Sequence, residues 1–447
     1  MKQFNGISEK SLNSYRNNYE NNKMSKMATK AMSKASIEDV CYDTIGAAKM
    51  NHKFSIEIPT MTVCNQKSSG RCWLFAALNT LREEIGKKTN VENIEISQNQ
   101  ISFFDKLEKA NFFLETIIET ADRPANDRLV NWVLSAPVSD GGQWDMFVAL
   151  VKKYWLVPKE AMPETYQSSN TGSMNRILNT KLREDAVILR KLINDGKSAD
   201  EVEAKKDEML SEIYNVLSVC LGNPPEKFDF EYVDKDKNYH IDRDLTPKSF
   251  YDKYIGVELD DYVSIINAPT ATKPFNKAYT VDHLGNVAEG NPICYLNLEM
   301  SEFKKAVVEQ LKNKQVVWFG SDVGKYGCGN EGVWATELYD YETPFGITFN
   351  MDKGDMLDYA QSSMNHAMVI TGVNLTEDGT PDKWKIENSW GDSKGNKGYY
   401  IMSDDWFDKY VYQACINKKY LTKAQIEILG EERIVLDPWD PMGTLAK

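Results

Sequence analysis

Residues 65–73 read Asn65-Gln66-Lys67-Ser68-Ser69-Gly70-Arg71-Cys72-Trp73, a polar loop with one glycine. The apolar run that follows spaces its leucines at helical intervals, so we expect a helix from about Trp73 to Arg82. Cys72 therefore stands where a loop opens into a helix. Unpaired N–H groups and the helix dipole favour an anion at such a position, and a cysteine reacts as its thiolate. Taken alone, Cys72 is also consistent with a small buried residue that only packs.

Two later segments supply the groups that a cysteine nucleophile needs. His366 stands at the start of an apolar strand pattern, and Asn388 ends an alternating run that begins at Trp384. If the two strands are neighbours, the Asn388 amide oxygen can accept from one imidazole nitrogen and aim the other at the sulfur. Each residue alone is ordinary. The combination indicates nucleophilic catalysis by Cys72, with His366 as its base and Asn388 holding the histidine.

Acyl transfer also needs donors for the charge that develops on the carbonyl oxygen. The backbone N–H of Cys72 and the side-chain amide of Gln66 are the candidates for this oxyanion hole. An exposed loop glutamine is ordinary by itself, so the assignment of Gln66 depends on the whole pattern.

The composition is that of a packed globular protein. The 447 residues are 42% hydrophobic, and the formal net charge of -13 argues against nucleic acid as a partner. No apolar run reaches the ~20 residues of a membrane helix, so we expect no membrane association. The polar stretch from Met1 to Lys30 lacks the apolar core of a secretory signal, which makes a cytoplasmic location the expectation.

The cysteines and histidines do not form a metal-binding pattern. The seven cysteines include no CxxC pair, and only four histidines accompany them. We therefore expect no metal and no organic cofactor.

Helical patterns precede strand patterns along the chain. A helix is expected from a cap at Ser97 to about residue 120, and two more between residues 178 and 220 with a break at Asp195-Gly196. The charges of this last pair indicate a solvated or oligomer-facing hairpin. Strands are expected at 315–320, 367–373, 384–388 and 398–401. This order favours an α+β fold over an alternating α/β fold.

Three segments in this order resemble the signature of the papain-like cysteine peptidases: Gln66 with Cys72-Trp73, Asn365-His366-Ala367, and Asn388-Ser389-Trp390-Gly391. The resemblance implies a two-lobed fold with large insertions, in which a helical lobe carries the nucleophile helix and an antiparallel β lobe carries the histidine and asparagine. It also implies that Trp390 shields the His–Asn hydrogen bond and that Gly141 and Gly142 bind the substrate strand.

The departures from the secreted members of this family are informative. Those enzymes have a disulfide between cysteines at the positions of Ser69 and Ser139, and a version without it suits a reducing cytosol. His366 and Asn388 also follow Cys72 by far more than the ~130–150 residues of papain-type enzymes. That difference implies about 150 inserted residues, largely between positions 150 and 350.

Three segments narrow the resemblance to the branch of bleomycin hydrolase and aminopeptidase C: residues 69–73, residues 140–145 and the closing Trp439-Asp440-Pro441-Met442-Gly443. It covers essentially the entire chain and implies a homohexamer with active sites facing an interior channel. A C-terminal arm would lie in the cleft, and its terminal carboxylate would meet the free amino group of a peptide. Ala446 and Lys447 would then be substrate-binding residues, with Ala446 at the end if Lys447 is removed.

The activity that this resemblance implies is removal of N-terminal amino acids from peptides with broad side-chain tolerance. Hydrolysis of the amide of bleomycin and of homocysteine thiolactone are implied side activities. The expected organisation is an N-terminal extension (1–60), a helical lobe (61–150), an inserted mixed region with the start of the β lobe (151–350), the β lobe with both partners of Cys72 (351–430) and the C-terminal arm (431–447).

Alternatives stay open. The same Cys-His-Asn machinery serves endopeptidases and acyltransferases, which differ from an aminopeptidase in needing no free N-terminus or in depending on an amine acceptor. Nucleic-acid binding has been linked to members of the hydrolase branch. For a chain of this net charge, with no evident Lys/Arg stripe, it would be a secondary role at most.

Overall fold

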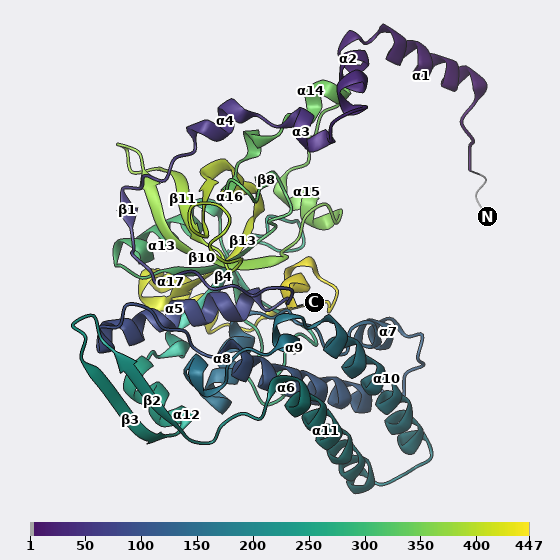
Figure 1. Ribbon diagram of the computed structural model, residues 1–447. Coiled ribbons are helices and arrows are strands. Elements are labelled where there is room, and N and C mark those ends of the chain that lie inside the picture. Colours follow the sequence, from purple (N-terminus) through teal and green to yellow (C-terminus); the bar gives the residue numbers. More distant parts are fainter. Residues whose placement is uncertain (1–3, 447) are drawn as a thin grey trace.

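The computed structural model describes residues 4–446 and divides them between a sheet-based lobe and a helical lobe (Figure 1). The C-terminal segment lies between the two lobes, as the yellow ribbon in Figure 1 shows. Lys447 lies outside the described residues. Within residues 4–446, no helix is both long and apolar enough to cross a membrane.

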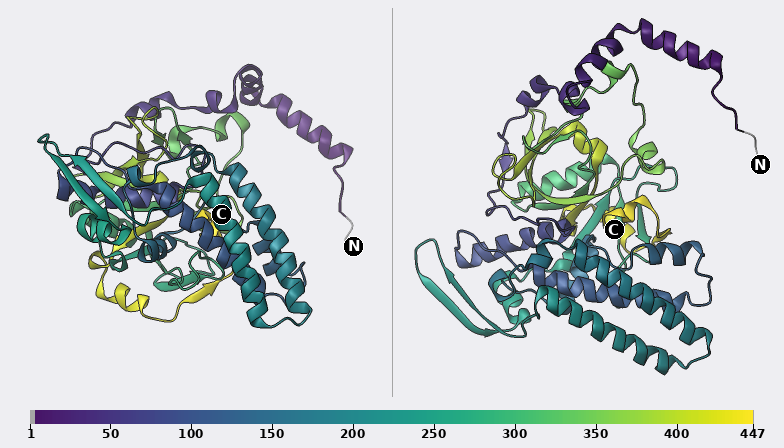
Figure 2. Two further views of the ribbon diagram at one scale, coloured as in Figure 1. Left: turned by 60° about the horizontal axis from the view of Figure 1, so that its bottom comes forward. Right: turned by 45° about the vertical axis from the view of Figure 1, so that its right-hand side comes forward.

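The N-terminal segment begins away from the β lobe and then runs along it (Figure 1). Its elements are α1 (Glu9–Asn21), α2 (Lys23–Met32), α3 (Ile37–Cys41), α4 (Thr44–Lys49) and β1 (Ile56–Glu57). α1 has no buried residue and projects away from both lobes in each view (Figures 1 and 2). α2 packs against α14 (Glu342–Phe345), and β1 pairs antiparallel with the C-terminal part of β10 (His366–Leu375) in the main sheet.

The helical lobe is built around the helix that begins at Cys72. Its elements are α5 (Cys72–Thr89), α6 (Gln98–Glu119), α7 (Arg128–Ser135), α8 (Trp144–Tyr154), η1 (Lys159–Ala161), α9 (Tyr166–Ser169), α10 (Gly172–Asn194) and α11 (Ala199–Leu221). α6, α10 and α11 pack together over an apolar core of their own. α5 packs against α6 and α8 on one side and against the main sheet on the other, so it lies at the junction of the lobes.

The main sheet has the order β14-β5-β6-β4-β13-β7-β10-β11-β12-β9-β8. Its strands are β4 (Tyr262–Ile266), β5 (Lys277–Val281), β6 (Tyr295–Asn297), β7 (Val317–Ser321), β8 (Gly327–Cys328), β9 (Val333–Trp334), β10 (His366–Leu375), β11 (Pro381–Glu387), β12 (Tyr399–Ser403), β13 (Val411–Asn417) and β14 (Ile434–Leu436). β10 runs antiparallel to both of its long neighbours, β7 and β11. A separate hairpin joins β2 (Phe228–Val233) and β3 (Tyr239–Leu245).

Short helices cover the sheet and connect its strands: α12 (Pro247–Phe250), η2 (Tyr251–Ile255), η3 (Leu259–Asp261), α13 (Met300–Lys312), η4 (Thr336–Leu338), α15 (Lys353–Asp358), α16 (Asp404–Tyr410), η5 (Lys418–Tyr420), α17 (Lys423–Leu429) and η6 (Pro441–Ala446). Helices gather in the first half of the chain and sheet strands in the second. The α+β class expected from the sequence is confirmed.

The residues expected to cap the starts of two helices are confirmed as caps. Ser97 caps α6 by accepting from the backbone N–H of Gln100. The Gln100 amide reaches the Trp155 carbonyl, so the reciprocal half of a capping box is not formed. The expected break at Asp195-Gly196 separates α10 from α11, and Ser198 with Glu201 forms a complete capping box.

Candidate active site

Cys72 is the first residue of α5, and a network of buried charges fixes the loop before it. The Arg71 guanidinium forms a bidentate ion pair with Glu164, with N–O distances of 3.0 and 2.7 Å. The Gly70 N–H donates to the Asp140 carboxylate at 2.9 Å. A Cβ on Gly70 would lie 2.7 Å from Asp140 Cβ, so only glycine fits this approach. The position of the Cys72 thiol is therefore set from both sides of the loop.

His366 and Asn388 meet at one edge of the sheet, as their strand patterns predict. His366 begins β10, Asn388 directly follows β11, and the two strands pair antiparallel. Imidazole Nε2 lies 2.8 Å from Asn388 Oδ1. Asn388 Oδ1 also accepts from the Ser389 N–H at 2.8 Å, which identifies it as the amide oxygen. Nε2 therefore carries the proton, and Nδ1 is left as the basic nitrogen.

β10 also brings Cys72 to this edge. The backbone N–H of Ala367, the residue after His366, donates to Cys72 Sγ at 3.4 Å. The Trp390 ring lies against the imidazole, with ring centroids 4.8 Å apart. The nucleophile candidate, the histidine, the asparagine and the tryptophan expected from the sequence thus form one cluster.

Gln66 is fixed beside the same cluster. Its Oε1 accepts from Ser389 Oγ at 2.6 Å, and its Nε2 donates to the Ser69 carbonyl at 2.6 Å. The Gln66 N–H donates to the Ser389 carbonyl, so this loop pairs with the turn that follows Asn388. An amide nitrogen carries two hydrogens, which leaves one on Nε2 for another acceptor.

The turn at Gly141-Gly142, here called the glycine turn, packs on Trp73, the residue after the nucleophile candidate. Trp73 Nε1 donates to the Asp140 carbonyl at 2.7 Å. A Cβ on Gly142 would lie 2.4 Å from the Trp73 ring, so the turn approaches too closely for any side chain. The Gly141 carbonyl accepts from Lys109 Nζ at 2.5 Å.

The lysines that hold this turn were not recognised from the sequence. Lys106 and Lys109 are buried on α6 and form ion pairs with Asp140 and Asp105 at 2.5 and 2.8 Å. On a helix, charged residues at such spacing usually face solvent. The local sequence offers no distinguishing signal, because α6 also carries Glu108, Glu115 and Glu119.

The C-terminal arm crosses from one lobe to the other at this place. η6 ends the described chain, and Thr444 Oγ1 donates to the Met364 carbonyl at 2.9 Å. Ser139 Oγ donates to the Ala446 carbonyl at 2.6 Å. Met364 stands two residues before His366, and Ser139 two residues before Gly141. The arm therefore spans the gap between the strand with the histidine and the glycine turn.

Burial, rather than the helix dipole, governs the charge states of the two central groups. Loss of hydration raises the pKa of the Cys72 thiol to about 11, against the pull of the Ala367 and Trp73 N–H groups. It lowers the pKa of His366 to about 4, against the hydrogen bond to Asn388. The direction for Cys72 is opposite to the expectation from its place at a helix start, because the side chain is only 5% exposed. At neutral pH a lone charge on either group is disfavoured.

Comparisons with known proteins agree on one family. The peptidase C1-like family model matches residues 6–443. Aminopeptidase C of Lactobacillus delbrueckii subsp. lactis is 52% identical, with 88% of each chain covered. Bleomycin hydrolase of Mus musculus is 42% identical, with 92% of each covered. The crystal structure of PepW from Lactobacillus rhamnosis HN001 matches with a TM-score of 0.97 at 48% identity, covering 98% of this chain and 99% of that one. The chain therefore belongs to the peptidase C1-like family, in the branch of papain-like cysteine aminopeptidases that includes aminopeptidase C and bleomycin hydrolase.

Proposed function

We propose that this enzyme removes the first residue from peptides with a free N-terminus, using Cys72 as nucleophile, His366 as acid and base, and Asn388 to orient the imidazole. The hydrogen bond from His366 Nε2 to Asn388 Oδ1 supports these roles, because it leaves Nδ1 as the basic nitrogen. Burial makes each lone charge costly, so the proton passes from sulfur to imidazole within the pair, which leaves the net charge of the site unchanged.

The reaction then follows a two-step acyl transfer. Cys72 Sγ attacks the carbonyl carbon of the first residue, the C–N bond breaks, and His366 gives its proton to the departing amine. Water attacks the resulting thioester while His366 takes one of its protons. The C–S bond breaks, the free amino acid leaves and the thiol is restored.

The oxyanion that forms in both steps is assigned to the Cys72 N–H and the remaining Nε2 hydrogen of Gln66. The fixed amide of Gln66, held by Ser389 and Ser69, supports this assignment, because a preorganised donor needs no reorientation during the reaction. Trp390 is assigned to shield the His–Asn hydrogen bond from water, and the Gly141-Gly142 backbone to hold the substrate strand.

The restriction to N-termini is assigned to the C-terminal arm. The observation that carries it is the course of η6, which bridges Met364, near His366, and Ser139, near the Gly141-Gly142 turn. A segment in that place leaves room for about one residue before the scissile bond, and a carboxylate at its end would pair with the α-ammonium. Ala446 is well placed to contribute, and Lys447 remains a candidate beyond the described residues.

Two further features belong to this proposal. A cytoplasmic location is supported by serine at positions 69 and 139, where the secreted enzymes have their disulfide. A homohexamer is supported by α1, which has no buried residue yet carries exposed Leu12 and Tyr15. Light scattering measures the mass of the assembly in solution, and the mass of a monomer would contradict the proposed hexamer. Hydrolysis of the bleomycin amide is a proposed side activity.

The test compares a fluorogenic aminoacyl amide with its N-acetylated form. The full chain is expected to cut the free substrate and leave the acetylated one, and Cys72→Ala is expected to cut neither. Equal rates on both substrates would make the protein an endopeptidase. Product formation that depends on an added amine would make it an acyltransferase.

A further inference from the structure

The tip of the C-terminal arm, residues 443–446, is hydrogen-bonded to the rest of the protein at Thr444 and at Ala446. The Thr444 hydroxyl donates to the Met364 carbonyl at 2.9 Å. Among the described residues, the Ser139 hydroxyl is the group outside η6 that hydrogen-bonds to Ala446, at 2.6 Å. The base of the arm is held separately, by the Tyr295 hydroxyl on the Met442 carbonyl at 3.2 Å and by the ion pair of Lys273 with Asp440 at 2.9 Å. Loss of the Ser139 hydroxyl would therefore free the Ala446 carbonyl and leave the contact of Thr444 and the base of the arm in place.

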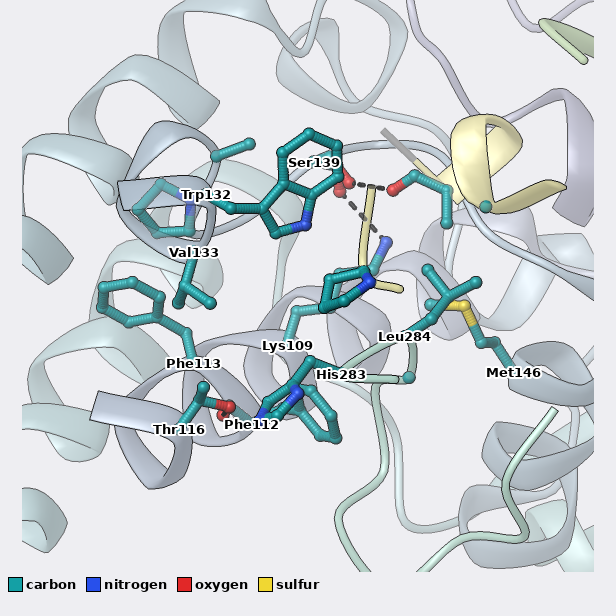
Figure 3. Close-up of a pocket in the computed structure, with 16 residues that line it drawn as sticks. Lys109, Phe112, Phe113, Thr116, Trp132, Val133, Ser139, Met146, His283 and Leu284 are labelled. Carbon is teal, nitrogen blue, oxygen red and sulfur yellow. Dashed lines mark hydrogen bonds between the residues drawn. The ribbon is translucent and has the colours of Figure 1, made fainter. Parts of the chain in front are cut away.

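Ser139 is itself a rigid anchor. The N–H of the preceding residue, Val138, donates to the Asn179 side-chain oxygen at 2.8 Å, and the Val138 carbonyl accepts from the Asn179 side-chain nitrogen at 3.1 Å. The Ser139 carbonyl accepts from Lys106 and Lys109, and Figure 3 shows the contact with Lys109 as a dashed line. The backbone that carries the Ser139 hydroxyl is therefore held in place.

The lysines around Ser139 do not neutralise the end of the arm. Lys106 is paired with Asp140 and Lys109 with Asp105, so the pairs together carry no net charge. A negative charge at the end of the arm would thus remain available for the α-ammonium of a substrate.

Packing leaves room beside the tip. A pocket of about 100 Å³ lies beside Ala446 and Gly443, and its walls include Lys109, Trp132 and Leu284 (Figure 3). The pocket borders one side of the tip, while Leu445 and Ala446 are buried in the main apolar core. The hydrogen bond from Ser139 therefore acts together with this packing and fixes the Ala446 carbonyl.

We propose that Ser139 is a specificity-determining positioning residue, whose hydroxyl fixes the reach of the C-terminal arm and thereby enforces the requirement for a free N-terminus. This inference rests on the proposed function. The hydroxyl is free for the task because no disulfide occupies this position. The serine at the matching position, Ser69, is engaged elsewhere, since it donates to the Gln66 carbonyl and accepts from Arg71 Nε.

The experiment measures kcat/KM for the free and N-acetylated aminoacyl amides in the full chain, in Ser139→Ala and in Ser139→Thr. The Ala variant is expected to lower the ratio of free to acetylated rates about fivefold, the effect of one hydrogen bond. KM is expected to rise for the free substrate, and the Thr variant is expected to restore both values. Ser135→Ala is the matched control, because its hydroxyl also donates to a backbone carbonyl, at 2.6 Å, but does not contact the arm.

Two results would overturn this assignment. An unchanged ratio in Ser139→Ala, in an enzyme that still prefers the free substrate, shows that the hydroxyl does not set specificity. If the Ala and Thr variants lower the ratio of free to acetylated rates equally, the site tolerates no change at this position. The loss of specificity is then not caused by the missing hydroxyl. If the unaltered chain cuts both substrates equally, the proposed function fails and this inference fails with it.

Discussion

Cys72 and His366 lie in a nearly dry environment, and their pKa values follow from it. Loss of hydration raises the pKa of the Cys72 thiol to about 11 and lowers the pKa of the His366 imidazole to about 4. The proposed mechanism needs His366 neutral at the start, so that it can take the proton from Cys72. His366 becomes protonated only as the pH falls through about 4, well below the ~6.5 of a free histidine.

We therefore expect kcat/KM to hold its value from neutral pH down to about 5 and to fall as the pH approaches 4. The measurement is the pH profile of kcat/KM on an aminoacyl amide, with protein stability checked at each pH. An acid limb centred near pH ~6.5 would show that His366 is hydrated in solution, contrary to this account.

Gly142 offers a second test at this scale. A Cβ there would meet the Trp73 ring at 2.4 Å, so Gly142→Ala should displace the turn that is proposed to bind the substrate and cost about 1–3 kcal/mol of stability. KM is expected to rise more than kcat falls. Gly172→Ala is the control, since a Cβ there meets nothing within 4 Å. If the two variants behave alike, the contact with Trp73 does not constrain the turn.

Among the secondary-structure elements, α5 begins with Cys72 and β11 directly precedes Asn388, and a buried ion pair joins the two elements. Arg82 on α5 lies 2.8 Å from Glu387 at the end of β11, directly before Asn388, and both side chains are buried. Asn79, one turn earlier on α5, donates to the same carboxylate oxygen at 2.8 Å. The helix that begins at Cys72 is thereby fixed to the strand that directly precedes Asn388.

Arg82→Met would leave the Glu387 carboxylate buried without its partner, at a cost of about 3–5 kcal/mol. Denaturant unfolding measures this change in the free energy of unfolding. The control is Lys423→Met, which removes an exposed ion pair with Glu427 and should cost at most about 1 kcal/mol. Similar values for the two variants would contradict the role of the Arg82–Glu387 pair.

The same elements show how far the sequence could be interpreted. The helix at Cys72 and the strands at His366 and Asn388 could be predicted, because their patterns are local and their order matches a known signature. The participation of β4 and β6 could not, since three to five residues give little periodicity and their partners lie far along the chain. Lys109 was missed for another reason. Its burial depends on acceptors from the glycine turn, which no local pattern reveals.

For the whole molecule, the central claim is that a segment of the chain's own C-terminus, which lies between the lobes (Figure 1), restricts the enzyme to free N-termini. The fold makes this possible because the main sheet ends in β14, after which the chain turns back between the lobes to Ala446 (Figure 1). The arm contacts both sides of the site at Met364 and Ser139. Specificity in this account is therefore a property of chain topology as much as of the catalytic residues.

The most direct test shortens the chain so that it ends at Met442, which removes the tip and keeps the buried base of the arm. Hydrolysis of N-acetylated and free aminoacyl amides is then compared with that of the full chain. The account predicts that the shortened enzyme accepts the acetylated substrate and loses its preference for free N-termini, while its catalytic residues remain intact. If the shortened enzyme still cuts only free N-termini, the arm does not set the specificity, and the central claim is wrong.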